Sequence, residues 1–143
     1  MMPTPNQIAL WFSTQDFFSL FLSVMQDVTL FTELGNVHLR PYQHEVAKAI
    51  TSSIIGKKGL TFVVIFPRQS GKNELQAQIE AYLLLLSCLT RAGMVKVSPT
   101  MKPQSLNAIR RLEHILKRNI LTRPYWVKKS VMFIRLVMPV SNF

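Results

Sequence analysis

The stretch LTFVVIFPRQSGKNE, at residues 60–74, constrains the fold of this chain more than any other segment. Its first seven residues are apolar or β-branched, and aromatic side chains are frequent among them. This composition is typical of a strand that is covered on both faces, as in a parallel sheet. The polar turn PRQSG follows, and a helical pattern begins near Lys72. We therefore expect a buried strand, a turn and a helix in direct succession.

The neighbouring segments repeat this alternation. Residues 42–55 show the apolar spacing of one helix face, with Pro41 placed to start the helix and Gly56 to end it. Further elements are expected as a helix at 72–91, a strand at 94–98, a helix at 103–118 and a strand-like segment at 131–138. Strands that alternate with helices predict an α/β fold, in which helices flank a mainly parallel sheet.

The N-terminal region, residues 1–34, is a separate hydrophobic segment. Asp16 and Asp27 interrupt its apolar run and leave ten residues between them, whereas a membrane span needs about 20. A secretory signal would also need basic residues at its start, and none occurs there. We interpret this region as an amphipathic helix that packs against the rest of the protein.

The charge is distributed unevenly. Residues 1–39 carry three acids and no Lys or Arg, whereas residues 40–143 hold all 17 basic residues and four acids. Such a surplus indicates a polyanion as ligand, either nucleic acid or nucleotide, although a solvated basic surface would give the same count. Cys88 is the single cysteine, so an internal disulfide is impossible. The three histidines lack neighbours at metal-ligand spacing, and we expect no metal site built from protein ligands alone.

The turn at 67–71 has the setting of a phosphate-binding loop. The standard P-loop reads G-x-x-x-x-G-K-[ST] between a buried strand and a helix. Its backbone N–H groups and the helix N-terminus bind phosphates, and its Lys neutralises them. Gly71 and Lys72 stand at the required places, but Phe66 replaces the first Gly and Asn73 replaces the Ser or Thr. The alternative is an ordinary helix start preceded by a polar turn.

An upstream glutamine fits the same function. Gln43 lies 28 residues before Gly71, within the stretch RPYQ at the start of the preceding helix. A Gln amide carries both a donor and an acceptor, which suits the edge of adenine. Taken alone, the stretch would be read as a surface turn.

The stretches LRPYQHEVAKAI, PRQSGKNE and VKVSPTMKPQSLNAIRRLEHIL together resemble the ATPase domain of the large terminase subunit of tailed bacteriophages. Proteins of that family package DNA into preformed heads. Their loops commonly read Arg-Gln-x-Gly-Lys, so both departures from the standard pattern are features of the family. The resemblance covers about residues 35–125. It implies a P-loop NTPase-like fold, ATP and Mg²⁺ as cofactors, and double-stranded DNA as a partner. Full-length members also bind portal protein and the small terminase subunit, in the cytoplasm of a bacterial host.

The resemblance also assigns roles to individual residues. The implied nucleotide-binding residues are Gln43, Arg68, Gln69, Ser70, Gly71, Lys72 and Asn73. Lys72 would neutralise phosphate charge, Gly71 would let the backbone approach the phosphates, and Gln43 would read adenine. Arg68 would act catalytically by polarising the γ-phosphate. Asn73 stands at the Mg²⁺ position, where an amide is a poorer ligand than a hydroxyl.

The catalytic acid of such a motor is missing from the sequence. A strand that ends in Asp-Glu would be needed to hold Mg²⁺ and activate water, and after Glu80 the only acid is Glu113. The carboxylate cluster of the nuclease domain is also missing. We therefore interpret residues 35–143 as a partial ATPase domain. The family continues with Gly-Asn-Ala where this chain reads VMPVSNF after Leu136, so we expect a frameshifted or split gene.

Two other interpretations stay open. The chain could be a fragment of another helicase-like ATPase that uses an adenine-reading Gln. It could also be a basic DNA-binding module without catalysis, in which the Gly-Lys pair is fortuitous.

Overall fold

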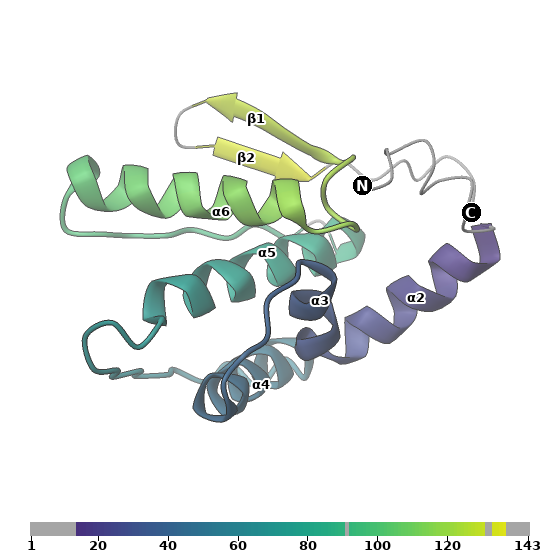
Figure 1. Ribbon diagram of the computed structural model, residues 1–143, viewed down its shortest axis with the longest axis horizontal. Helices are drawn as coiled ribbons and strands as arrows, with labels where there is room; N and C mark the ends of the chain where they lie inside the picture. The colour runs from purple at the N-terminus through teal and green to yellow at the C-terminus, as the bar shows by residue number, and fades with distance from the viewer. Residues whose placement is uncertain (1–13, 91, 131–132, 137–143) are drawn as a thin grey trace.

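The computed structural model describes residues 14–90, 92–130 and 133–136 (Figure 1). Its elements are α2 (Thr14–Gln26), α3 (Val28–Leu34), α4 (Pro41–Ile55), α5 (Lys72–Thr90), the short π-helical turn η1 (Met101–Ser105), α6 (Leu106–Arg118), β1 (Trp126–Ser130) and β2 (Phe133–Leu136). Most of the described chain is therefore helical.

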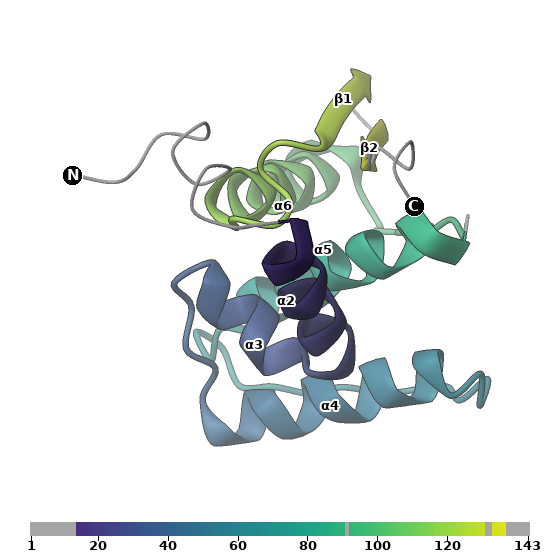
Figure 2. The ribbon, with the colours of Figure 1, turned by 90° about the vertical axis from the view of Figure 1, so that its right-hand side faces the viewer.

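Helix α5 lies at the centre of the molecule. It contacts α6 and β2 on one side, and α3 and α4 on the other. Figures 1 and 2 show the resulting stack, with α6 and the β1–β2 hairpin above α5 and with α4 below it. Because α5 is covered from both sides, its apolar residues Ala77, Ile79, Ala81, Tyr82 and Leu85 are all buried.

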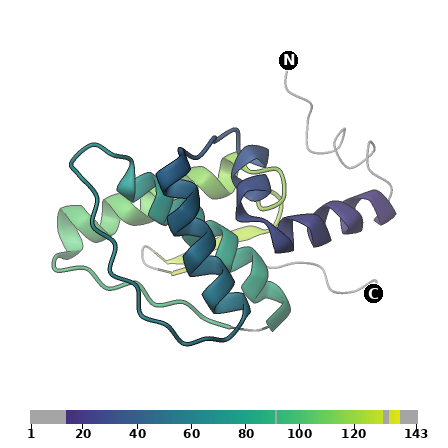
Figure 3. The ribbon, with the colours of Figure 1, turned by 90° about the horizontal axis from the view of Figure 1, so that it is seen from below.

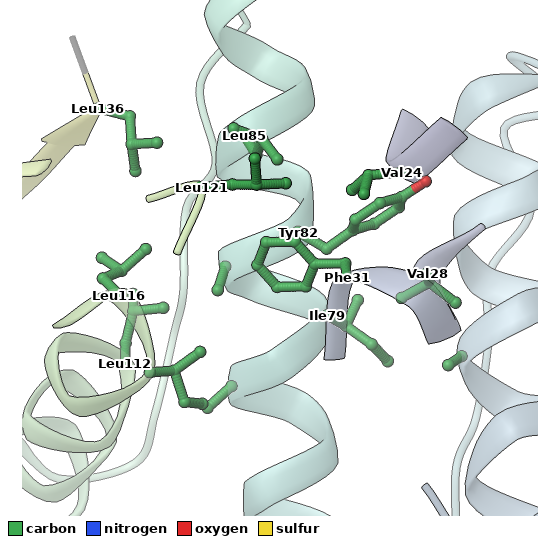
Figure 4. Packing of buried hydrophobic residues seen from close by; sticks show 14 of the residues in the cluster. Val24, Val28, Phe31, Ile79, Tyr82, Leu85, Leu112, Leu116, Leu121 and Leu136 are labelled. Carbon is green, nitrogen blue, oxygen red and sulfur yellow. The ribbon is translucent and has the colours of Figure 1, made fainter. Parts of the chain in front are cut away.

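Tyr82 of α5 occupies the middle of the hydrophobic core (Figure 4). Its ring centroid lies 5.5 Å from that of Phe31 on α3. Its hydroxyl donates a hydrogen bond to the backbone oxygen of Met25, at 2.9 Å. Residues 14–34 therefore share one core with the later helices. They form two helices, α2 and α3, where the sequence predicted one packing helix within residues 1–34, and residues 1–13 lie outside the described part of the chain.

A buried asparagine joins the two ends of this core. The Nδ2 atom of Asn119 donates to the backbone oxygen of Phe31 at 2.7 Å. Its Oδ1 atom accepts from the backbone N–H of Leu121 at 3.0 Å. Because Asn119 is fully buried, these bonds satisfy polar atoms that would otherwise be costly to remove from water.

The predicted helices are confirmed, with small changes at their ends. Helix α4 begins at Pro41 and its C-cap is Gly56. Helix α5 begins at Lys72, as the end of the PRQSG turn predicted. Helix α6 begins at Leu106 rather than at residue 103, because η1 precedes it. The strand-like segment at 131–138 contains β2, while residues 131–132 and 137–138 lie outside the described part of the chain.

The prediction of a mainly parallel α/β sheet, and with it of a P-loop NTPase-like fold, is wrong. The described residues form one sheet, and it consists of β1 and β2 paired antiparallel, with Trp126 opposite Leu136. Residues 60–66 and 94–98 are not strands. A strand exists only with a hydrogen-bonded neighbour, and no backbone hydrogen bond joins either segment to another described residue. The core is built by helices instead.

Both segments nevertheless have the alternating exposure of a strand. Along residues 62–65 the exposed fraction alternates. Val63 and Ile65 are 84% and 87% exposed, whereas Phe62 and Val64 are 38% and 36% exposed. Val95 and Val97 are each 88% exposed. Side chains of an extended segment point alternately to opposite sides. One side of each segment therefore faces the helices and the other faces solvent.

Among the described residues, no helix combines the length and the apolar character that crossing a bilayer requires.

Candidate phosphate-binding loop

Residues 67–71 form a tight turn that delivers Lys72 to the first position of α5. Gln69 and Gly71 have φ angles of 60° and 79°, in the left-handed region. The Ser70 hydroxyl donates to the backbone oxygen of Pro67 at 2.7 Å, and the N–H of Leu75 donates to the backbone oxygen of Gly71 at 2.9 Å. The first N–H groups of a helix have no partner within the helix, so this end of α5 offers donors to an anion.

Side chains from the start of α4 hold the turn in place. The Nε2 atom of Gln43 donates to the backbone oxygen of Ser70 at 3.1 Å, and the Tyr42 hydroxyl donates to the same oxygen at 2.8 Å. The Gln43 Oε1 atom accepts from the backbone N–H of Arg40 at 3.0 Å. The ring of Tyr42 also meets the ring of Phe66 edge-on, with centroids 5.4 Å apart. The loop is thus tied to α4 by two hydrogen bonds and one aromatic contact.

Gly71 fits this arrangement because it has no side chain. A Cβ atom at position 71 would lie 2.5 Å from the Nε2 atom of Gln43, which is closer than such atoms approach in proteins. The positive φ angle disfavours other residues independently. Gln43 and Gly71, which the sequence predicted to act together, are therefore in direct contact.

The two cations of the loop are exposed. Arg68 and Lys72 both face solvent, beside the exposed amide of Asn73. The ion pairs of the described residues are Glu80 with Lys96, Glu74 with Arg111, and Glu113 with Lys128. Neither loop cation belongs to these pairs, so both charges are available to a ligand.

Gln43 is buried, with 8% of its surface exposed. Each end of its amide makes a hydrogen bond within the protein. The structure therefore gives Gln43 a role in positioning the loop. The sequence had indicated only that Gln43 reads adenine. The bond from Tyr42 to Ser70 carried no sequence signal, because 28 residues separate the two.

Glu74, in the first turn of α5, is already engaged. Its carboxylate accepts from Arg111 of α6 at 3.1 Å and from the Nε2 atom of Gln78 at 3.2 Å. Both partners in the ion pair are substantially exposed, so the pair adds little stability. It does direct the carboxylate toward α6. This contact between α5 and α6 was not predicted from the sequence.

The donor set does not fit Mg²⁺. Magnesium prefers several oxygen ligands, usually with at least one carboxylate. The amide of Asn73 is the one candidate ligand that the family resemblance supplies, and the nearby carboxylate of Glu74 is bonded to Arg111. Within the described ranges, no three His, Cys, Asp or Glu side chains are grouped as metal ligands.

A separate pocket lies between α5, α6 and β2. Its lining includes Glu80, Cys88, Lys96 and Arg135, and no residue of the 67–71 turn. Glu80 and Lys96 are paired across it at 2.7 Å. Burial raises the pKa of the Cys88 thiol, which makes this thiol a weaker nucleophile at neutral pH. The pocket is therefore distinct from the candidate loop.

Comparisons of the chain with protein-family models, with curated proteins and with solved structures found no match.

Proposed function

We propose that residues 67–73 bind the phosphates of ATP, and that the chain is the nucleotide-binding part of a phage DNA-packaging motor, the terminase large subunit. The observation that carries this proposal is the contact of Gln43 and Tyr42 with the backbone of Ser70. It fixes a Gly-Lys turn at the N-terminus of a 19-residue helix, where anions are favoured.

Each residue of the loop has a distinct task in this proposal. Lys72 neutralises the terminal phosphates, and the exposed Arg68 interacts with the γ-phosphate. Gly71 allows the backbone to approach the phosphates closely. Gln69 and Ser70 contribute backbone N–H groups. Gln43 acts through Ser70, as a positioning residue.

Hydrolysis is not part of the proposed activity of this chain alone. Lys72 and Arg68 can hold a triphosphate, but activation of the attacking water needs a carboxylate beside the γ-phosphate. Glu74, the nearest carboxylate in sequence, is held by Arg111. ATP also brings its own Mg²⁺, for which the loop offers no set of protein ligands. We propose nucleotide binding without turnover.

A titration with ATP and with inorganic triphosphate tests the proposal. We expect Lys72→Ala to lower the affinity for both about tenfold or more, a loss of roughly 1.4 kcal/mol or more. Lys57→Ala is the matched control, because Gly56-Lys57 is also a Gly-Lys pair but lies at the end of α4. It removes the same charge without touching the loop, and we expect a change below about twofold.

Equal losses in the two variants would contradict the loop assignment, since they would show attraction to the overall positive charge. Phosphate release provides a second measurement. We expect the purified chain to release phosphate no faster than the Lys72→Ala variant, with or without DNA. Turnover that depends on Lys72 would contradict binding without hydrolysis, and Glu74→Gln would then identify the acid.

A second candidate function, DNA binding, is favoured by α6. Its apolar side is buried through Leu112, Ile115 and Leu116. Its opposite side exposes the cations Arg110, Lys117 and Arg118 to solvent. We define these three residues as the basic face of α6. Arg110 and Lys117 lie about two helical turns apart on the same side of α6, with Arg118 next to Lys117, and exposed cations arranged in this way suit contacts with DNA phosphates.

The two functions are compatible in a packaging motor, which handles double-stranded DNA and also meets portal protein and the small terminase subunit. DNA binding without nucleotide binding would instead favour a simple DNA-binding module. Measuring both ligands on the same protein separates the two cases. If ATP binds and DNA still binds after Lys72→Ala, the sites are distinct.

A further inference from the structure

Two extended segments each present apolar side chains that nothing in the described chain covers. Val63 and Ile65 lie on the segment below α5 in Figure 1, and Val95 and Val97 lie on the segment above it; all four are more than four-fifths exposed. Figures 1 and 3 show that the two segments run in the same sense, each returning from the end of one helix to the start of the next. Apolar side chains at alternate positions of an extended chain are typical of a sheet surface rather than of a loop.

The inner sides of the same segments are fixed. Phe66 packs against the hydrophobic core and against Tyr42. Lys96 is paired with Glu80 of α5 at 2.7 Å. The extended shape of both segments is therefore imposed by the helices beneath them, and the outer side is presented in a fixed register.

The backbone of residues 60–66 is unpaired in the described structure. No hydrogen bond within the described ranges uses its N–H or C=O groups, and none joins it to residues 94–98. An unpaired, apolar, extended segment is a template for strand addition, and proteins normally protect such edges with charge, proline or a cover. Residues 60–66, LTFVVIF, contain none of these devices.

The flanking charges indicate the chemistry of the partner. Lys57 and Lys58 precede the segment and Arg68 follows it, and all three are exposed. A second copy of this chain would bring the same cations to both ends, at a net charge of +10 per chain, and like charges oppose association. A strand that carries acidic residues at its ends would complement both flanks.

We propose that residues 60–66 bind an extended strand of another polypeptide, which has alternating apolar side chains and acidic residues at its two ends. The strand pairs with the backbone of 60–66, and its apolar side chains lie beside Val63 and Ile65 on the outer side of that segment. Main-chain hydrogen bonds supply the affinity and the charged ends supply the selectivity, as in other cases of strand addition. This docking requires no nucleotide and does not depend on Lys72.

A designed peptide tests the proposal on the full chain. The probe is Glu-Glu-Val-Thr-Val-Ile-Val-Glu-Glu, labelled with a fluorophore and titrated by anisotropy. The same peptide with Lys in place of Glu tests the charge, and a version with N-methylated backbone at alternate residues tests the pairing. We expect the acidic peptide to bind, the Lys peptide to bind at least about tenfold more weakly, and the N-methylated peptide not to bind.

The protein side is tested with two double variants. Val63→Glu with Ile65→Glu should abolish binding of the acidic peptide. These side chains are almost fully exposed, so the variant should still fold, which circular dichroism and the melting temperature will check. Ile54→Glu with Ile55→Glu is the matched control, because both residues are 50% exposed at the end of α4 and the charge change is the same.

Amide hydrogen exchange supplies an independent measurement. Pairing should slow exchange at the N–H groups of residues 61–66 in the presence of the acidic peptide, in the parent protein and in Lys72→Ala alike. Absence of peptide binding, equal binding of the N-methylated peptide, or equal binding by the two double variants would overturn the proposal. Self-association of the chain that is lost in Val63→Glu would also overturn it, and would assign the segment to a second copy.

Discussion

At the scale of single residues, Gly71 determines the shape of the candidate loop. Two constraints act on it separately: a left-handed backbone and the contact with the Gln43 amide. The chain also contains glycines that separate these effects. Gly59 has a left-handed φ of 63° with nothing near its missing side chain, and Gly93 has open space without a left-handed φ.

We expect Gly71→Ala to destabilise the protein most, Gly59→Ala less, and Gly93→Ala hardly at all. A left-handed φ at a residue other than glycine costs of the order of 1–3 kcal/mol, which applies to Gly71 and Gly59 alike. The contact with Gln43 adds to the cost at Gly71 alone. Chemical denaturation of the three variants measures the order. Equal losses at Gly71 and Gly59 would show that Gln43 moves aside freely.

A second prediction at this scale concerns Gln43. Because its amide bonds Ser70 and Arg40, Gln43→Ala should loosen the loop whatever base the nucleotide carries. We expect the affinities for ATP and GTP to fall by the same factor, and the unfolding free energy to fall by about 1–3 kcal/mol. Titrations with the two nucleotides check this. A loss confined to ATP would show that Gln43 reads adenine.

At the scale of elements, α5 contacts α3, α4, α6 and β2, and its Tyr82 is a central residue of the core. Desolvation by burial, helped by the negative charge of Asp27, raises the pKa of Tyr82 to about 12 from the ordinary value of 10.0. The phenol is therefore neutral in the folded state at a pH where it would already ionise in the unfolded chain. Its contribution to stability is complete below pH 10.0 and is lost as the pH rises toward about 12.

We expect the unfolding free energy of the parent protein to fall steeply across this alkaline range. Tyr82→Phe removes the titrating group, so its stability should depend less on pH there. At neutral pH the variant should be less stable by about 1 kcal/mol, because the hydrogen bond to Met25 is lost. Denaturation curves at a series of pH values measure both effects. Parallel pH profiles for the two proteins would show that Tyr82 does not titrate in the folded state as described.

The elements also show which structure a sequence can predict. Helices α4, α5 and α6 were predictable because their hydrogen bonds are local, and Pro41, Gly56 and the periodic apolar residues act within a few positions. Residues 60–66 have the composition of a strand, yet a strand also needs a neighbour from elsewhere in the sequence or from another chain. Composition does not reveal whether that neighbour is present.

The candidate site was predictable to the same extent. The turn at 67–71 and its proximity to Gln43 followed from motifs with a known spacing. The link between Glu74 and Arg111 joins residues 37 positions apart, and neither carries a local pattern that names the other. For the same reason, only the structure shows that the carboxylate of Glu74 is paired with Arg111.

At the scale of the whole molecule, the charge is divided between an acidic start and a basic remainder, and the basic face of α6 lies far from α4 in the stack (Figure 2). Binding to DNA phosphates releases counterions. The logarithm of the DNA affinity should therefore fall linearly with the logarithm of the salt concentration. Each phosphate contact contributes roughly 0.9 to the slope.

We therefore expect the triple variant Arg110→Ala, Lys117→Ala and Arg118→Ala to reduce the slope by up to roughly 2.7. Lys48→Ala, which removes an exposed cation from α4, should leave the slope unchanged and serves as the control. DNA titrations at several salt concentrations measure the slopes. An affinity independent of salt, or a slope that only Lys48→Ala changes, would exclude the basic face of α6 as the DNA contact.

The hydrogen bond between Asn119 and Phe31 has a consequence for the synthesis of the chain. It joins residues 88 positions apart, and Leu121 packs in the same core as α2 and α3. A ribosome that has made α2 to α5 has therefore produced helices whose shared interior is still open. Helices α2 and α3 acquire their last buried neighbours only when the residues after α6 have left the exit tunnel. Until then part of the apolar surface of the early helices stays uncovered, and the time needed to translate η1 and α6 sets how long that exposure lasts.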